Sequence, residues 1–147
     1  MFNAAQALEH LGAQTGLGKL AFDDEGVCGL IVGEDMELFF HGDPDEDFLQ
    51  FTGVVGDLRD DVLARRLLEL NAADHNGPAA FAADPLTGEI LLTRHLSLAE
   101  LSPEALLAVV EDFVDRLGFW IEYLPRMDIR DDDSPDEHAP DAVVLRG

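Results

Sequence analysis

The sequence is poor in cysteine, in basic residues and in long apolar runs. Its single cysteine, Cys28, leaves no internal disulfide and favours a reducing compartment. Nine Lys and Arg stand against 31 Asp and Glu, so the formal net charge is −22. Such a surface repels nucleic-acid phosphates and anionic membranes, and we expect neither as a partner. Because the sequence has no signal-peptide pattern and no apolar run near the ~20 residues of a membrane span, we expect a cytoplasmic protein.

Familiar catalytic motifs are also missing. The sequence has no G-x-S-x-G elbow, phosphate-binding loop, dinucleotide fingerprint or H-E-x-x-H pair. The five histidines lack the spacing of metal ligands, and Cys28 has no positive charge near it in sequence. Residues 43–47 begin like a calcium loop, but Phe48 and Val54 stand where that loop needs Gly and Glu. We therefore expect no enzyme activity, no metal and no cofactor.

The remaining composition is that of one folded domain. Hydrophobic residues make up 47% of the 147 residues, which is enough to build a core. Residues 127–147 differ: they are acidic, contain proline and have few large apolar side chains. We expect a folded domain over residues 1–126 and a disordered acidic tail over residues 127–147.

Short strands separated by tight, acidic turns follow a first helix. Asn3 and Gln6 form a capping-box pattern at the start of that helix. The short spacing of the apolar runs is typical of an antiparallel meander. The expected strands are residues 19–22, 27–32, 36–41 and 48–55.

A central helix, a hairpin and a final helix complete the pattern. Asp57 is the expected N-cap of the central helix, and Ser102 with Pro103 begins the final one. Residues 79–83 and 89–95 form the hairpin between them. The order α-β-β-β-α-β-β-α, with the strand at 19–22 as an extra, predicts an α+β fold with helices flanking an antiparallel sheet.

The central helix and the strand after it indicate an interface. Leu67 and Leu70 lie on one side of the helix and Leu68 lies on another, so the apolar band is wider than one contact needs. Residues 79–83 form a strand of mostly small side chains that another backbone can approach. These features predict half of a symmetric dimer interface. The alternative is a helix buried in a monomer.

The meander carries apolar residues on both of its faces. Helices packed on one face would require apolar residues on that face only. An extended polypeptide could cover part of this surface. The alternative is that each such residue belongs to an ordinary core. The candidates for the covered patch are Leu8, Leu11, Leu17, Leu30, Val32, Phe39 and Phe51.

In the succession of its segments, the chain resembles the class I chaperones of bacterial type III secretion, the Tir chaperone or CesT-like family. Four segments carry the resemblance: 17–28 (LGKLAFDDEGVC), 63–71 (LARRLLELN), 81–92, and 96–98 followed by 103–120. They occur in the family's order and at family-like spacing. The most distinctive single match is Asn71.

The resemblance implies an acidic homodimer, joined through its central helix, that works without nucleotide or cofactor. It implies a chaperone that binds the N-terminal segment of a secreted effector and keeps that segment soluble and non-globular. It also implies delivery of the effector to the secretion apparatus, whose ATPase is a further expected partner. The expected effector-binding residues are Leu8, Leu11, Leu17, Phe22, Leu30, Val32 and Phe39. The expected dimer residues are Leu67, Leu70, Asn71, Ala80, Phe81 and Ala82.

The acidity supports a second interpretation, from a different class of protein. An acidic protein can imitate the charge of nucleic acid and block a basic partner. Carboxylates at ordered spacing on one face would favour such a mimic. A contiguous apolar groove would favour a chaperone.

Overall fold

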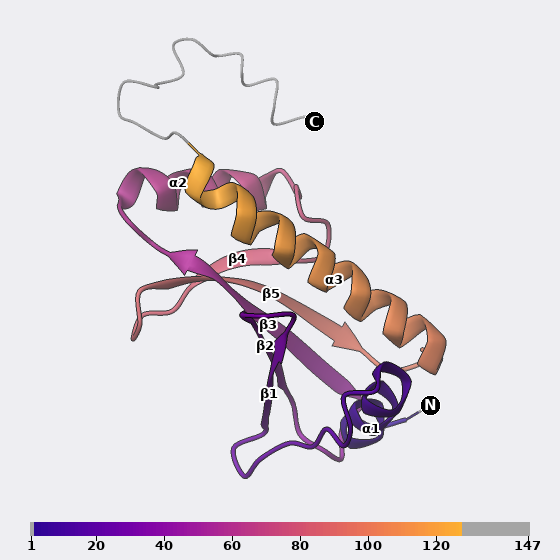
Figure 1. Ribbon diagram of the computed structural model, residues 1–147. Helices are drawn as coiled ribbons and strands as arrows, with labels where there is room; N and C mark the ends of the chain where they lie inside the picture. Colours follow the sequence, from indigo (N-terminus) through magenta and orange to yellow (C-terminus); the bar gives the residue numbers. More distant parts are fainter. Residues whose placement is uncertain (1, 128–147) are drawn as a thin grey trace.

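The structure, a computed structural model, describes residues 2–127 (Figure 1). The predicted tail, apart from Met127, lies outside the described residues. The described residues form the predicted α+β fold, with helices flanking an antiparallel sheet. In chain order the elements are α1 (Ala4–Thr15), β1 (Val27–Val32), β2 (Met36–His41), β3 (Phe48–Asp57), α2 (Asp61–Ala72), β4 (Ala80–Ala83), β5 (Glu89–Ser97), α3 (Pro103–Tyr123) and the 3-10 turn η1 (Leu124–Arg126).

The five strands form one sheet in the order β1-β2-β3-β5-β4. All neighbouring strands are antiparallel, and β3 with β5 makes the longest pairing. The register of that pairing shifts between Val54 and Gly56, which marks a bulge near the end of β3. Because β1 and β4 each pair with one strand only, they are the two edges of the sheet.

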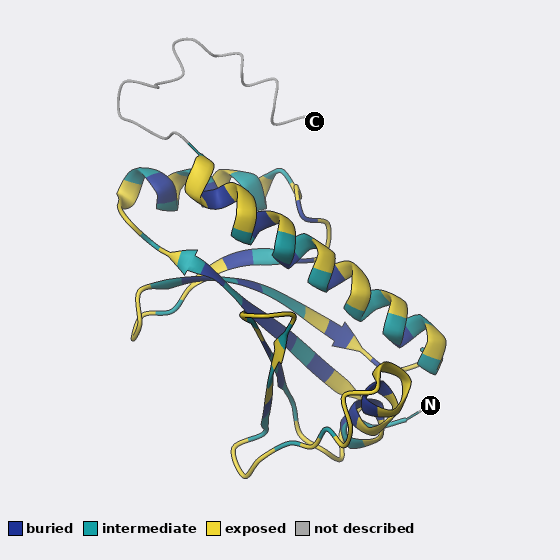
Figure 2. Cartoon of the chain, in the orientation of Figure 1, coloured by how far each residue is buried: buried dark blue, intermediate teal, exposed yellow. Residues whose placement is uncertain are grey.

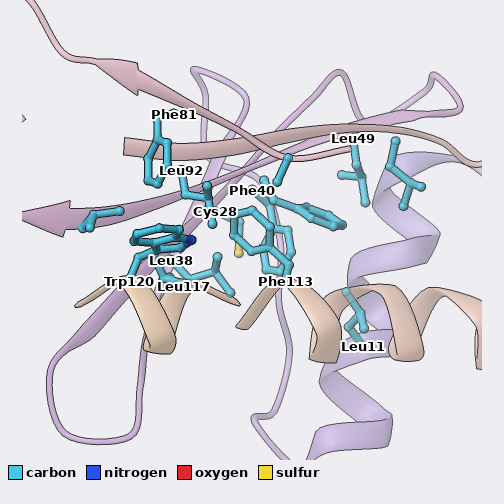
Figure 3. Close-up of a cluster of buried hydrophobic side chains, with 14 of the residues drawn as sticks. Leu11, Cys28, Leu38, Phe40, Leu49, Phe81, Leu92, Phe113, Leu117 and Trp120 are labelled. Atoms are coloured by element: carbon cyan, nitrogen blue, oxygen red, sulfur yellow. The ribbon is translucent and has the colours of Figure 1, made fainter. Parts of the chain in front are cut away.

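Helices α1 and α3 cover one face of the sheet, with α3 crossing it diagonally and α1 packed beside the start of α3 (Figure 1). The strands turn alternate residues into this core, as burial along the chain shows (Figure 2). Phe51 is fully buried and makes edge-to-face contacts with Phe40 at 5.4 Å and with Phe113 of α3 at 5.5 Å. Figure 3 shows Phe40 and Phe113 within this buried cluster. Trp120 extends the cluster toward Phe81.

Glycine lets α3 approach β3 closely. Gly53 is buried in β3, and a Cβ placed on it would collide with the side chain of Leu117. A helix that lies this close to a strand buries more of both than a larger residue would allow. Gly53 therefore sets the distance between α3 and the sheet.

The helix caps agree with the sequence at two helices and differ at the third. Asn3 and Gln6 make the predicted capping box, and the Ser102 side chain accepts a hydrogen bond from the amide of Ala105. The predicted cap of α2 was wrong, because β3 continues through Asp57. Asp60 caps this helix instead, and its carboxylate accepts from the amide of Leu63 at 2.9 Å.

The strand predicted at residues 19–22 was also wrong. Residues 19–22 form no strand and do not belong to the sheet, in which β1 is an edge strand and pairs only with β2. Gly16 and Gly18 have φ angles of 77° and 90°, which turn the chain back toward α1. Leu20 and Phe22 then pack against the core from an irregular segment, so their apolar spacing is satisfied without strand pairing.

Candidate functional site

The face of the sheet opposite α1 and α3, here called the open face, is the first candidate site. The register brings the outward side chains of four strands into cross-strand rows, one of which runs Phe39–Thr52–Thr93–Ala80. The ring of Phe39 lies over the backbone of Gly29, whose Cβ, if present, would be 3.0 Å from it.

The open face exposes apolar side chains that the core does not use. Ile31 is 54% exposed and Phe48 is 44% exposed, while Phe39, Val54 and Leu91 are half-buried. Side chains of this kind on an uncovered sheet are characteristic of a surface that binds another polypeptide.

The open face has no basic strand residue. The charged strand residues that the register turns toward it are Glu37, Asp57 and Glu89. His41 and His95 flank Gln50 in a neighbouring row, and burial lowers the pKa of His41 below its ordinary value of 6.5. The centre of the face is therefore a mixture of apolar side chains and polar ones such as Thr52, Thr93 and Gln50, with carboxylates toward one end.

A second apolar region lies on the helix-covered face, where β1 and β2 meet α3. Leu30, Val32 and Met36 are half-buried there, and the methyl group of Met36 reaches Gly118 of α3. This strip borders the free edge of β1. An extended segment could pair with that edge and bury its side chains on the strip.

Helix α2 closes the other edge of the sheet. The Asn71 side chain binds both main-chain groups of Phe81: Oδ1 accepts from its N–H at 2.8 Å and Nδ2 donates to its carbonyl at 3.0 Å. Toward solvent, α2 presents Leu68, which is 67% exposed. Near this edge Trp120 packs on Phe81, and α3 adds a stacked pair of exposed rings, Phe119 and Tyr123, 5.4 Å apart.

The predicted effector-binding residues fall in four places rather than in one patch. Leu8 and Leu11 of α1 are fully buried, whereas Leu17 and Phe22 belong to the irregular segment after α1. Leu30 and Val32 lie on the strip beside α3. Phe39 lies on the open face, and the additional candidate Phe51 is at the centre of the core.

The predicted dimer residues gather around α2 and β4. Leu67 and Phe81 are buried in the chain's own core, and Leu70 and Asn71 are half-buried. On β4, Ala80 is half-buried and Ala82 is exposed.

The sequence prediction omitted several exposed apolar side chains. Ile31 and Phe48 alternate with core residues, so strand periodicity could have assigned them to the open face. Phe119 and Tyr123 are four residues apart on α3, beside its buried stripe, where helical periodicity could have separated them from the core.

The described residues offer little for catalysis. They contain no group of three or more His, Cys, Asp or Glu placed to hold a metal ion. Burial raises the pKa of the Cys28 thiol, although the amide of Ala21 opposes this, so the sulfur is a poor nucleophile. Over the part of the chain that the structure covers, no helix has both the length and the apolar character that a bilayer crossing requires.

A protein-family model, that of the Tir chaperone protein (CesT) family, matches residues 6–120. The chain belongs to this family. The chain is also similar to the transcriptional anti-antiactivator ExsC of Pseudomonas aeruginosa, with 26% identity over 120 residues, which are 80% of this chain and 83% of ExsC.

Solved structures share the fold of this CesT-family chain. The crystal structure of the ExsC–ExsE complex matches with a TM-score of 0.70 and 23% identity, over 80% of this chain and 90% of the matched chain. The HopA1–SchA chaperone–effector complex matches with a TM-score of 0.63 and 19% identity, over 80% and 91% of the two chains. A protein of a chaperone–effector complex therefore shares this fold.

Proposed function

We propose that this protein is a type III secretion chaperone that binds the N-terminal chaperone-binding segment of a secreted effector. It keeps that segment soluble and non-globular and aids its delivery to the secretion apparatus. Membership of the CesT family is the observation that carries the proposal. The proposed place of action is the cytoplasm, and the proposed activity is binding rather than catalysis.

The distribution of apolar surface supports this function. A bound segment would lie on the open face around Ile31 and Phe39 and reach the strip at Leu30 and Val32 by crossing the free edge of β1. An extended chain that uses both surfaces can bury well over about 1,000 Å² without folding into a globule. Apolar contact is its main source of affinity, because the open face carries no basic strand residue.

A symmetric dimer is the second part of the proposal. Leu68 projects from α2 into solvent, and its neighbours on the same side, Ala64 and Ala72, are small. Two copies of α2 could approach closely along this side. Since Asn71 already occupies the main chain of Phe81, the copies would meet through side chains rather than by joining their sheets.

A regulatory role is a second candidate function, favoured by the likeness to ExsC. An anti-antiactivator, as its name says, counteracts a protein that restrains an activator of transcription. The same surfaces could bind such a regulatory protein when the effector has been exported. Two different polypeptides would then compete for one chaperone.

The test begins with capture of partners from the native cytoplasm by the purified protein, followed by mass spectrometry. The N-terminal segment of each captured secreted protein is then titrated against the wild type and against Phe39→Ser. Truncating a central anchor should weaken binding by about 1–3 kcal/mol, whereas Leu86→Ser at the 94%-exposed hairpin tip should leave it unchanged. Equal affinity for all three proteins would exclude the open face.

A further inference from the structure

The segment between α1 and the turn before β1 is held in an unusual way. Residues 16–22, here called the strap, form no regular secondary structure. Among the described residues, no backbone–backbone hydrogen bond involves residues 17–22. Gly16 and Gly18 have positive φ angles, a backbone conformation that glycine adopts without strain. Packing, rather than main-chain pairing, holds the strap in place, and the Gly18 carbonyl takes the space that a side chain at Gly12 of α1 would fill.

Two apolar side chains fix the strap. A Cβ added to Gly12 of α1 would lie 3.3 Å from Cγ of Leu20, and one added to Gly42 would lie 3.4 Å from Cζ of Phe22. Leu20 and Phe22 are two residues apart and both are half-buried against the core, while Ala21 between them is exposed. This alternation is that of an extended peptide seated on a surface.

Cys28 lies behind the strap. It is 6% exposed, belongs to the buried cluster in Figure 3, and its sulfur is close to the amide of Ala21. The thiol is therefore a natural reporter for the strap. Local opening costs less free energy where few main-chain hydrogen bonds must break, so the strap should open more often than the whole domain unfolds.

We infer that the strap occupies a docking site in the free protein and gives it up to a partner. Leu20 and Phe22 occupy the two positions, beside Gly12 and Gly42, that apolar side chains of an extended partner segment would occupy after the strap opens. The partner's identity as an effector rests on the proposed function, but opening of the strap is a property of the free chain. Until a partner binds, the strap keeps apolar surface away from water.

Thiol labelling tests the opening without any partner. The wild type is exposed to a thiol reagent over a range of urea concentrations below the unfolding transition. The control is Cys28→Ala/Val55→Cys, which moves the only thiol to a β3 position that is also 6% exposed but away from the strap. The thiol at Cys28 should be labelled at least about tenfold faster than the thiol at position 55 of the control, and its labelling rate should be nearly independent of the urea concentration. Equal rates with equal urea dependence would overturn the proposal.

A variant separates strap opening from loss of global stability. Phe22→Ser removes one of the two side chains that hold the strap, and should raise the labelling rate of Cys28 several-fold. In the control background with the thiol at position 55, the same substitution should change the rate much less. Equal acceleration in both backgrounds would mean that Phe22 stabilises the whole domain and that no separate strap exists.

A peptide tests whether the two positions bind an extended segment once the side chains of Leu20 and Phe22 have been removed. The probe is a synthetic peptide with the sequence of residues 14–22, QTGLGKLAF, added to the Leu20→Ser/Phe22→Ser variant. It should slow labelling of Cys28 several-fold, whereas a peptide with the same residues in scrambled order should not. No protection, or equal protection by both peptides, would overturn the docking site. Neither result depends on the effector, so failure here is distinct from failure of the proposed function.

Discussion

Asn71 and Phe81 are joined by two hydrogen bonds between one side chain and one residue's main chain. The amide of Asn71 accepts from the N–H of Phe81 at 2.8 Å and donates to its carbonyl at 3.0 Å. Phe81 lies on the edge strand β4, whose outer main-chain groups have no strand to pair with. The side chain thus substitutes for a neighbouring strand, and α2 blocks strand addition at this edge. At the other edge strand, β1, Asp23 binds both main-chain groups of Val27 at the start of the strand.

Asn71→Ala should lower the free energy of unfolding by about 1–3 kcal/mol, because a half-buried N–H and carbonyl both lose their partner. Urea denaturation measures the change. Glu69→Ala on the exposed side of the same helix is the control, and should cost less than about 0.5 kcal/mol because its ion pairs are exposed. If both variants lose the same free energy of unfolding, the hydrogen bonds of Asn71 stabilise the fold no more than an exposed ion pair does.

Gly53→Ala should destabilise the protein by about 1–3 kcal/mol, because its methyl group would force Leu117 and α3 away from the sheet. Gly56→Ala on the same strand is the matched control. Its Cβ would lie 3.5 Å from Leu124, an ordinary contact distance. Thermal unfolding compares the two, and a Gly53→Ala melting temperature no lower than that of Gly56→Ala would contradict the close approach.

His41 should make stability depend on pH. Burial lowers its pKa in the folded state below the 6.5 of an ordinary histidine, so the unfolded chain binds more protons as the pH falls through 6.5. This contribution therefore destabilises the fold below about pH 6.5 and is absent above it. When the pH is lowered from 7.5 to 5.5, the urea midpoint of His41→Gln should fall less than the urea midpoint of the wild type. Parallel pH profiles for the two proteins would remove His41 from the account.

The proposed dimer depends on α2. Leu68→Asp should give a monomer, because a charge in a dry interface has no partner, and it should preserve the fold since Leu68 is 67% exposed. Leu86→Asp at the 94%-exposed hairpin tip is the control and should remain a dimer. Sedimentation at micromolar concentration distinguishes one from two copies of 16.1 kDa. A wild type that sediments as a monomer would end the dimer proposal.

Sequence patterns predicted the order of helices and strands because local signals mark them clearly. Asn3 and Ser102 cap their helices as predicted, and the turn from Asp84 to Gly88 closes the predicted hairpin. The strand at 19–22 was wrong because periodicity cannot tell a paired strand from an extended segment packed by Leu20 and Phe22. Pairing is a property of the whole sheet, and no local pattern encodes it.

The site was harder to predict than the fold. In the structure, the apolar residues predicted to bind an effector lie in four places: the core, the strap, the strip beside α3 and the open face. Periodicity predicts which face of a helix or strand is apolar, but it does not predict whether another element covers that face. Leu8 and Phe39 are both apolar residues in a periodic pattern, yet Leu8 faces the core from α1 and is fully buried, whereas Phe39 lies on the open face and is half-buried. Exposure is decided by tertiary packing, which needs the positions of all three helices.

The central claim is that an apolar polypeptide segment binds this acidic protein. Its most direct test is calorimetry of the captured effector segment at low and high salt and at several temperatures. Apolar burial predicts a negative heat-capacity change and an affinity that salt weakens little. Steep loss of affinity with salt, together with a heat-capacity change near zero, would contradict the claim and identify the protein as a charge mimic.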